Sequence, residues 1–324
     1  MKGMAYGAFA LGILLFAAVI LYVGADDVAA ALVSGGWALP AIVACHILPL
    51  AIDAQAWRLL FERGLRPGLA RACALRWVCE AVNNLLPVAQ LGGEFARARL
   101  AARGGVSLSA AGAVGTADVT LGALTQVPFA LVGLMGLAVV SANDHGYVLW
   151  ALGGGLGVLT ALVLAFVRFQ QAGPGRIAMG LVRRLRPGAV RAADPAALDR
   201  EIGAVYARRG PLALAAFWRF AAWLAGAGEI WLALHFLGSP ISVPEAIVLE
   251  SVLQLVRSVA FLVPAALGVQ EGALVLLASA FGFSPEIGLA VSLLRRGRDV
   301  VLGVPGLVFW QMAEGARLRS RLRS

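Results

Sequence analysis

The stretches 85-LLPVAQLGGEFAR-97 and 262-LVPAALGVQEG-272 share one pattern, in which a proline, a glycine and a glutamate interrupt an apolar segment. A proline cannot continue a helix and glycine frees the backbone, so each stretch is predicted to be two half-helices that meet at a kink. The kink residues are Pro87, Gly92 and Gly93 in the first stretch, and Pro264 and Gly268 in the second. Interrupted segments at matching positions in two halves of a membrane protein indicate a transporter with a site near the midplane.

The composition of the chain is typical of a membrane protein that crosses the bilayer several times. Of its 324 residues, 60% are hydrophobic and only 14% are charged. Six apolar runs are long enough to be full spans, namely residues 5–24, 38–57, 117–140, 147–167, 212–236 and 287–312. The broken segments 74–96 and 246–282 are predicted to be re-entrant hairpins. The expected fold is therefore all-α, a single transmembrane domain over residues 1–324.

The positively charged residues lie mostly in loops that the predicted topology places on one side of the membrane. Lys and Arg fall in the loops on the side of the amino terminus, and the opposite loops carry acids such as Asp26, Asp144 and Glu245. The bias places both termini in the cytoplasm. Three full spans separate the hairpins, so the hairpins should enter from opposite faces, one in a first repeat (5–140) and one in an inverted second repeat (212–312). The basic loop 168–210 between the repeats should hold an amphipathic helix on the membrane surface.

Several other classes of protein are not indicated by the sequence. The first apolar run has only Lys2 as a basic leader, which favours an uncleaved anchor over a signal peptide. The net charge of +9 is explained by topology and by attraction to anionic headgroups, without a nucleic-acid partner. Cys45, Cys73 and Cys79 have no disulfide or metal spacing. The three histidines are scattered and no nucleophile or nucleotide-binding motif is found, so no catalytic residue, metal or cofactor is expected.

A glycine-rich run at residues 153–157 lies inside a predicted span, where close helix packing is its expected use.

The late cluster Arg295-Arg296-Gly297-Arg298-Asp299 is the most unusual group of charges. The last span should begin with Ser284 as N-cap and Pro285 as its first residue. At 1.5 Å per residue Arg295 then lies about 15 Å deep, near the middle of the hydrocarbon. Arginines at that depth should face a wet cavity, a carboxylate or an anionic ligand such as a phosphate. The alternative is a bend that brings them to an interface.

Arg257 on the incoming arm of the second hairpin has two interpretations. It lies seven residues after Glu250 on the same helix face and could pair with it. It could instead be a second phosphate ligand, opposite the late arginines.

Glu94 and Glu271 each follow a glycine break, in the first turn of a half-helix. A carboxylate there is favoured by the helix dipole and by free backbone N–H groups. The competing roles are an ion pair with the buried arginines and a proton site. Arg97, one turn after Glu94, should be among the first basic groups that an anion from the cytoplasm meets.

The remaining polar residues at membrane depth have simpler expected roles. Asp118 could pair with one of the arginines above, or it could lie shallow enough to be hydrated. Asn83 and Asn84 could cap the half-helix or bind a headgroup. Asp53 and Glu229 are interpreted as hydrated acids near helix ends. Arg219 is expected to reach the cytoplasmic surface.

These motifs resemble those of the transmembrane domain of the lysylphosphatidylglycerol synthase/flippase family, over nearly the whole chain. The resemblance is carried by the following residues: Asn83, Asn84, Leu85, Leu86, Pro87, Gly92, Gly93, Glu94, Arg97, Arg257, Phe261, Pro264, Gly268, Glu271, Gly272 and Arg295. Residues 85–100 look most similar to the hopanoid-biosynthesis-associated subgroup. The resemblance implies a bacterial inner-membrane protein that moves or binds polar lipids. The aminoacyltransferase domain of the full-length synthases has no counterpart in these 324 residues.

The sequence therefore predicts a lipid flippase whose partners are membrane lipids. A midplane cavity would hold an anionic phospholipid or hopanoid-type headgroup between the arginines, and Glu94 and Glu271 would balance the charge. One alternative is a non-transporting scaffold that docks a lipid-biosynthesis enzyme on the basic cytoplasmic loop. Another is a membrane-embedded transferase that uses buried carboxylates.

Overall fold

The structure, a computed structural model, describes residues 33, 36–86, 92–140, 146–171, 195–259 and 266–321. Within these ranges it has ten α-helices, one 3-10 turn and no strand, which confirms the all-α class. The helices are α3 (Ala38–Leu59), α4 (Leu69–Leu85), α5 (Gly92–Ala102), α6 (Leu108–Val140), α7 (Gly146–Gln171), α9 (Pro195–Ala207), α10 (Arg209–Phe236), α11 (Val243–Val259), α12 (Val269–Ala280) and α13 (Pro285–Arg321); the turn η1 is Arg63–Leu65.

Long helices occupy five of the six predicted spans. They are α3, α6, α7, α10 and α13, and α13 begins at Pro285 as its capping sequence predicts. The run 5–24 lies outside the described residues. Two described helices are long and apolar enough to cross a membrane by length and composition alone, Ala38–Leu59 and Leu108–Ala138.

Both predicted helix breaks are present. The first separates α4, which ends at Leu85, from α5, which begins at Gly92; the second separates α11 from α12. Gly268, just before α12, has a φ of 76°, which glycine adopts without strain. A Cβ on Gly93 would lie 2.2 Å from the Cys79 carbonyl oxygen, so only glycine lets α5 begin this close to α4. Pro87 and Pro264 lie outside the described residues.

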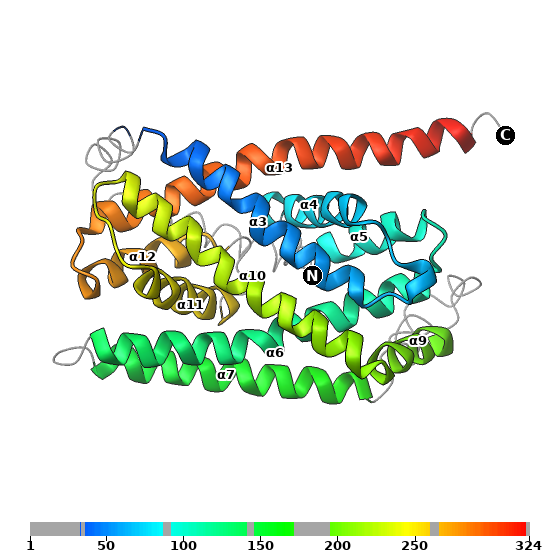
Figure 1. The fold of residues 1–324 in the computed structure, drawn as a ribbon, viewed down its shortest axis with the longest axis horizontal. Coiled ribbons are helices and arrows are strands. Elements are labelled where there is room, and N and C mark those ends of the chain that lie inside the picture. Colours follow the sequence, from blue (N-terminus) through cyan, green and yellow to red (C-terminus); the bar gives the residue numbers. More distant parts are fainter. Residues whose placement is uncertain are drawn as a thin grey trace, which may run out of the picture.

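Figure 1 shows how the two broken pairs lie in the bundle. Helix α3 packs along α10 through the middle, α6 packs beside α7, and α13 contacts α3, α4 and α12. The α4 and α5 pair lies toward the right of the view, and the α11 and α12 pair toward the left. Each pair is accompanied by its own buried apolar cluster, one built mainly from α10, α11 and α12 and the other from α3, α4 and α6.

Arginines gather at one end of the bundle. Arg208, just before α10, donates to the Leu60 carbonyl oxygen at 2.6 Å, which connects the start of α10 to the end of α3. Partial burial, followed by the nearby charges of Arg58, Arg63 and Arg208, lowers the pKa of Arg66. A guanidinium whose charge is disfavoured by several like charges belongs to a concentrated basic rim.

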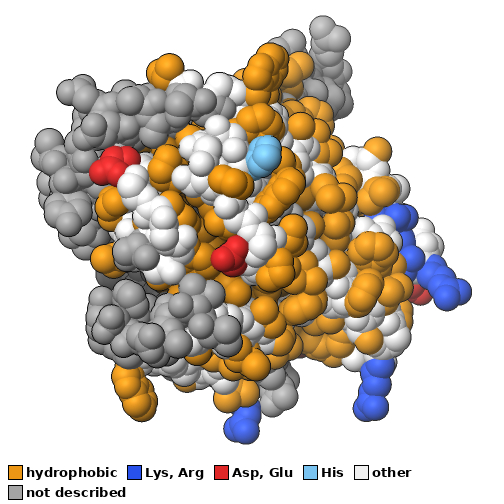
Figure 2. Space-filling view, turned by 60° about the vertical axis from the view of Figure 1, so that its left-hand side comes forward, with side chains coloured by type: hydrophobic (Ala, Val, Ile, Leu, Met, Phe, Trp, Pro, Cys, Tyr) orange, Lys and Arg blue, Asp and Glu red, His pale blue; other side chains and the backbone are white. Residues whose placement is uncertain are grey.

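Apolar side chains cover much of the described surface (Figure 2). Large hydrophobic residues stand in the open on several helices, among them Met135 on α6 (70% exposed), Trp150 on α7 (84%) and Leu276 on α12 (77%). Apolar surface of this extent indicates contact with lipid or with another protein.

Two predictions concern the middle of the chain. A Cβ added to Gly153, Gly154 or Gly157 would meet no heavy atom of the described residues within 4 Å. That this run serves close helix packing stays a prediction. Most of the expected amphipathic helix in 168–210 lies outside the described residues, and α9, at its end, packs against α6.

Candidate functional site

A cavity of about 240 Å³ lies where α3, α4, α10, α11 and α13 meet. Its walls are strongly charged for the interior of a hydrophobic protein. The charged lining residues are the carboxylates Asp53, Glu80, Glu229 and Glu250 and the arginines Arg76, Arg219, Arg257, Arg295 and Arg298, with His46, Asn83, Asn84 and Gln254 beside them.

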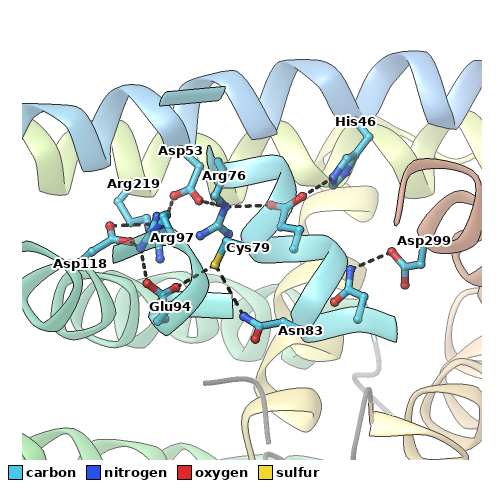
Figure 3. Close-up of polar contacts among 12 residues, drawn as sticks. His46, Asp53, Arg76, Cys79, Asn83, Glu94, Arg97, Asp118, Arg219 and Asp299 are labelled. Carbon is cyan, nitrogen blue, oxygen red and sulfur yellow. Dashed lines mark hydrogen bonds and ion pairs between the residues drawn. The ribbon is translucent and has the colours of Figure 1, made fainter. Parts of the chain in front are cut away.

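The ion pairs form a series that starts at α5, and Figure 3 shows its first part, from Arg97 to His46. Arg97 donates to Glu94 on its own helix and to Asp118 of α6, at 2.5 Å for the second contact. Asp118 also lies 3.7 Å from the guanidinium of Arg219 on α10, and Arg219 donates in turn to Asp53 on α3. The chain of charges thus crosses from the first hairpin to the centre of the bundle.

The series of ion pairs continues along the cavity wall. Arg76 of α4 lies 2.6 Å from Asp53 and 2.9 Å from Glu80. Glu80 contacts Nε2 of His46 at 2.9 Å, and Nδ1 of the same ring lies 2.6 Å from Glu229. The imidazole therefore joins α4 to α10.

The last ion pairs of the network reach α11 in the second hairpin. Glu229 accepts a hydrogen bond from Arg298 of α13 and lies 4.0 Å from Nε of Arg295. Arg295 donates to both carboxylate oxygens of Glu250 on α11, at 2.5 and 3.2 Å. Glu250 also accepts from Gln254 at 2.6 Å. The geometry of Arg295 and Glu250 is bidentate, the arrangement in which a guanidinium binds a carboxylate most strongly.

Many members of this network are buried, so each of them needs a partner of opposite charge. Arg295, Arg298, Asp118 and Glu229 are all less than 5% exposed. Removing such ions from water costs several kcal/mol each, about as much as a good pair returns, so an unpaired member would be strongly unfavourable. The fold can hold these charges in its interior because each member of the ion-pair network has a partner of opposite charge.

Arg257 departs from this rule. Its side chain lines the cavity, yet among the described residues no hydrogen bond and no ion pair within 4 Å is made by its guanidinium. Glu250, the partner proposed as one alternative, is held by Arg295 instead, so that interpretation is wrong. Among the described residues, Arg257 is therefore the cavity arginine that no carboxylate pairs with, in a wall where five arginines face four carboxylates, although Nε of Arg219, Arg295 and Arg298 also has no hydrogen-bond partner. Such a group is suited to bind an anion.

Four of the nine predicted site residues line the cavity: Arg257, Arg295, Arg298 and Asn84. Asn84 donates to Asp299 at 3.1 Å. Arg295 and Arg298 are 3% and 4% exposed, so the proposed bend that would carry them to an interface is wrong. Arg296 is not a lining residue, because it points to the other side of α13 and donates to Glu271 at 2.9 Å.

The other predicted residues lie in the ion-pair chain or beside α12. Glu94 and Glu271 are in the first turns of α5 and α12, and each pairs with an arginine. Glu271 meets Arg296 of the late cluster, and Glu94 meets Arg97. The Asn83 side chain accepts from the Gly93 backbone N–H at 2.8 Å, the capping role that was one of its alternatives.

The prediction that Arg97 meets incoming anions is wrong. Its side chain is 1% exposed, is neutralised by Glu94 and Asp118, and lies with its guanidinium carbon 4.8 Å from the centroid of the Trp57 ring. Asp118 pairs with this arginine and is 1% exposed, which confirms the first of its two alternatives and shows that the second, hydration, is wrong. Arg97 therefore joins α5 to α6 instead of facing the cytoplasm.

Sequence reasoning missed the central members of the network. The predictions that Asp53 and Glu229 are hydrated and that Arg219 reaches the cytoplasmic surface are wrong, because the two acids are 5% and 2% exposed and all three residues are paired. The physical reason is that α3 packs along α10, which brings Asp53 opposite Arg219 and His46 opposite Glu229. The available signal was a charged residue at mid-helix on each of these two apolar segments.

The arrangement holds no metal site among the described residues, where no three His, Cys, Asp or Glu groups come together as ligands. A family model described as "Lysylphosphatidylglycerol synthase TM region" matches residues 9–306. No curated protein and no solved structure matches the chain.

Proposed function

Because the chain belongs to the family of the lysylphosphatidylglycerol synthase transmembrane region, we propose that it is a lipid transporter of the flippase type. Membership links the protein to the membrane and to lipids. The proposed cargo is a phospholipid or hopanoid-type lipid with an anionic headgroup, carried through the cavity while its apolar tail stays in the bilayer. The chain itself would carry out no chemical conversion in this role.

The observation that carries this proposal is the unpaired guanidinium of Arg257 in a cavity whose other arginines are neutralised. A phosphodiester offers acceptor oxygens that match the donor fork of arginine. The cavity volume of about 240 Å³ lies below the roughly 300–1,000 Å³ of pockets that enclose whole drug-sized ligands. A headgroup fits such a space, and an entire lipid does not.

The packing of the helices supports an inverted repeat. If α3, α4, α5 and α6 correspond to α10, α11, α12 and α13, the contacts between elements occur in matching pairs. The contact of α4 with α13 matches that of α11 with α6. The contacts of α3 with α4 and of α5 with α6 match those of α10 with α11 and of α12 with α13. Helices α3 and α10, which contact one another, would lie at the axis that relates the halves, as expected for a carrier whose access alternates.

The sequence spacing agrees with this correspondence. Four residues of the first half are each followed, 177 positions later, by their counterparts in the second: Glu80 by Arg257, Pro87 by Pro264, Glu94 by Glu271 and Asp118 by Arg295. Two of the four pairs exchange an acid for an arginine. At these two positions the second half therefore has an arginine where the first half has an acid, which favours an anion site beside α11.

A liposome assay tests the transport function. The purified protein is reconstituted with fluorescent lipids whose headgroups are anionic, zwitterionic or aminoacylated, and with a labelled hopanoid, and leaflet exchange is followed by dithionite quenching. We expect the protein to accelerate exchange of at least one lipid with an anionic group. Equal exchange with and without the protein for every lipid would contradict transport and leave the scaffold alternative.

Cysteine labelling in bacterial cells tests the proposed orientation, with both termini in the cytoplasm of the inner membrane. Single cysteines replace Arg63 or Ser107, which flank the first hairpin, and Ser242 or Ser284, which flank the second, in a chain without its three native cysteines. All four positions are exposed. We expect an impermeant maleimide added outside to label only positions 242 and 284. Labelling of all four, or of one flank from each hairpin, would contradict inverted hairpins.

A further inference from the structure

His46 lines the cavity, and the contacts of its ring go beyond those needed to join α4 to α10. Its side chain, 15% exposed, projects from α3 into the cavity. Nε2 lies 2.9 Å from Glu80, and Nδ1 lies 2.6 Å from Glu229. Nδ1 also lies 2.9 Å from the terminal nitrogen Nη1 of Arg298. One ring nitrogen therefore faces a pure acceptor and a pure donor at once.

These contacts satisfy the imidazole in both of its protonation states. When the ring is protonated, Nε2–H donates to Glu80 and Nδ1–H donates to Glu229. When it is neutral, Nε2–H still donates to Glu80, and Nδ1 accepts from Arg298. Both terminal nitrogens of Arg298 keep a partner in either state, because Arg298 also donates to Glu229 and to Asp299, at 2.6 Å for the second. The two ring nitrogens thus keep a partner in either state, whereas Oε1 of buried Glu229 loses its hydrogen bond when the proton leaves Nδ1, so proton binding at Nδ1 completes the pairing of Glu229.

The charges around the ring come from every helix packed against it. They are Glu80 and Arg76 on α4, Glu229 on α10, and Arg295, Arg298 and Asp299 on α13, with the thiol of Cys45 next to it on α3. Carboxylates and guanidiniums are mixed in this shell, and the two carboxylates that contact the ring directly, Glu80 and Glu229, favour its protonated form. A further anion in the cavity would favour the protonated ring still more.

We propose that His46 is a proton-binding site coupled to the headgroup site, so that the anionic headgroup enters the cavity together with one proton. The inference rests on the proposed function, because it assumes an anionic ligand beside Arg257. The proton is taken from water onto Nδ1, and the contact of Arg298 with Nδ1 is replaced by the Nδ1–H bond to Glu229. On release of the headgroup the exchange runs in reverse. Coupling of this kind is reciprocal, so a lower pH strengthens headgroup binding and a bound headgroup strengthens proton binding.

Nitrogen-15 NMR of the histidine ring tests proton binding without a transport assay. His145 and His235 are changed to asparagine, so that His46 is the single histidine of the full-length chain. We expect a doubly protonated ring at low pH that converts to the Nε2–H tautomer as the pH rises. Addition of short-chain phosphatidylglycerol should increase the proton affinity about fivefold or more, and short-chain phosphatidylcholine should change it less. A ring that keeps one protonation state throughout, or a titration that phosphatidylglycerol does not shift, would overturn the proposal.

Two variants separate this inference from the proposed function. His46→Gln removes the titrating group, and we expect it to bind phosphatidylglycerol with an affinity that no longer changes with pH. Arg257→Gln keeps His46 but should abolish the shift caused by phosphatidylglycerol. If liposomes show transport while the NMR titration is unaffected by the anion, the coupling is wrong and the transporter stands. If the titration shifts but no lipid is exchanged between leaflets, the coupled site stands and the flippase function is wrong.

Discussion

The variant Arg97→Gln is expected to lose about 3–5 kcal/mol of stability, the typical cost of removing one partner from a buried ion pair. The guanidinium of Arg97 is 1% exposed and is shared between Glu94 and Asp118. Glutamine would leave both carboxylates buried with weaker partners and would remove the contact over the Trp57 ring. Thermal unfolding of the detergent-solubilised protein, followed by tryptophan fluorescence, measures the loss.

Arg63 provides the matched control for this substitution. It lies on the exposed turn η1, and Arg63→Gln should change stability by less than about 0.5 kcal/mol. Combining Arg97→Gln with Asp118→Asn should recover part of the loss, because the second change removes one of the carboxylates that the first leaves unpaired. Equal melting temperatures for Arg97→Gln and Arg63→Gln would show that the ion pairs at α5 do not hold the first hairpin in place.

The variant Arg257→Gln should fold normally and lose at least about 90% of anionic-lipid transport. Hydrogen bonds to charged groups contribute about 1.5–3 kcal/mol each, and every 1.4 kcal/mol is a factor of ten in affinity. Stability should change little, because the Arg257 guanidinium has no hydrogen-bond or ion-pair partner among the described residues. Leaflet exchange of a labelled anionic lipid in liposomes measures the effect, beside the melting temperature of the same preparation.

Arg257→Lys refines this expectation. Lysine keeps the positive charge but replaces the planar donor fork by a point charge, so intermediate transport is expected. Arg63→Gln again serves as the control and should transport at the wild-type rate. Transport by Arg257→Gln at the wild-type rate would remove this residue from the headgroup site, and loss of its fold would mean that Arg257 has a structural role after all.

Local features of the fold could be predicted from the sequence because they depend on the chemistry of neighbouring residues. The breaks after α4 and α11 follow from proline and glycine, and the start of α13 follows from Ser284 and Pro285. The interior position of Arg295 follows from its distance along that helix. These arguments need no knowledge of which helices touch.

The partners of the buried charges could not be predicted, because they are distant in sequence. His46 meets Glu229, 183 residues away, and Arg219 meets Asp53, 166 residues away. Both contacts exist only because α3 packs along α10. Without that contact each charge appears alone on an apolar helix, and hydration near a helix end is then the simpler interpretation. The prediction for Arg97 is wrong for a similar reason, since its partner Asp118 lies on the next helix.

Photo-crosslinking with a phosphatidylglycerol analogue that carries a diazirine in its headgroup tests the central claim most directly. The reconstituted protein is irradiated, digested and mapped by mass spectrometry. The account predicts that the label falls on peptides from the cavity walls, α4 around Asn84 and α11 around Arg257, and that Arg257→Gln removes it. A label confined to the lipid-facing surfaces of α6 and α7, unchanged in Arg257→Gln, would contradict a headgroup site in the charged cavity.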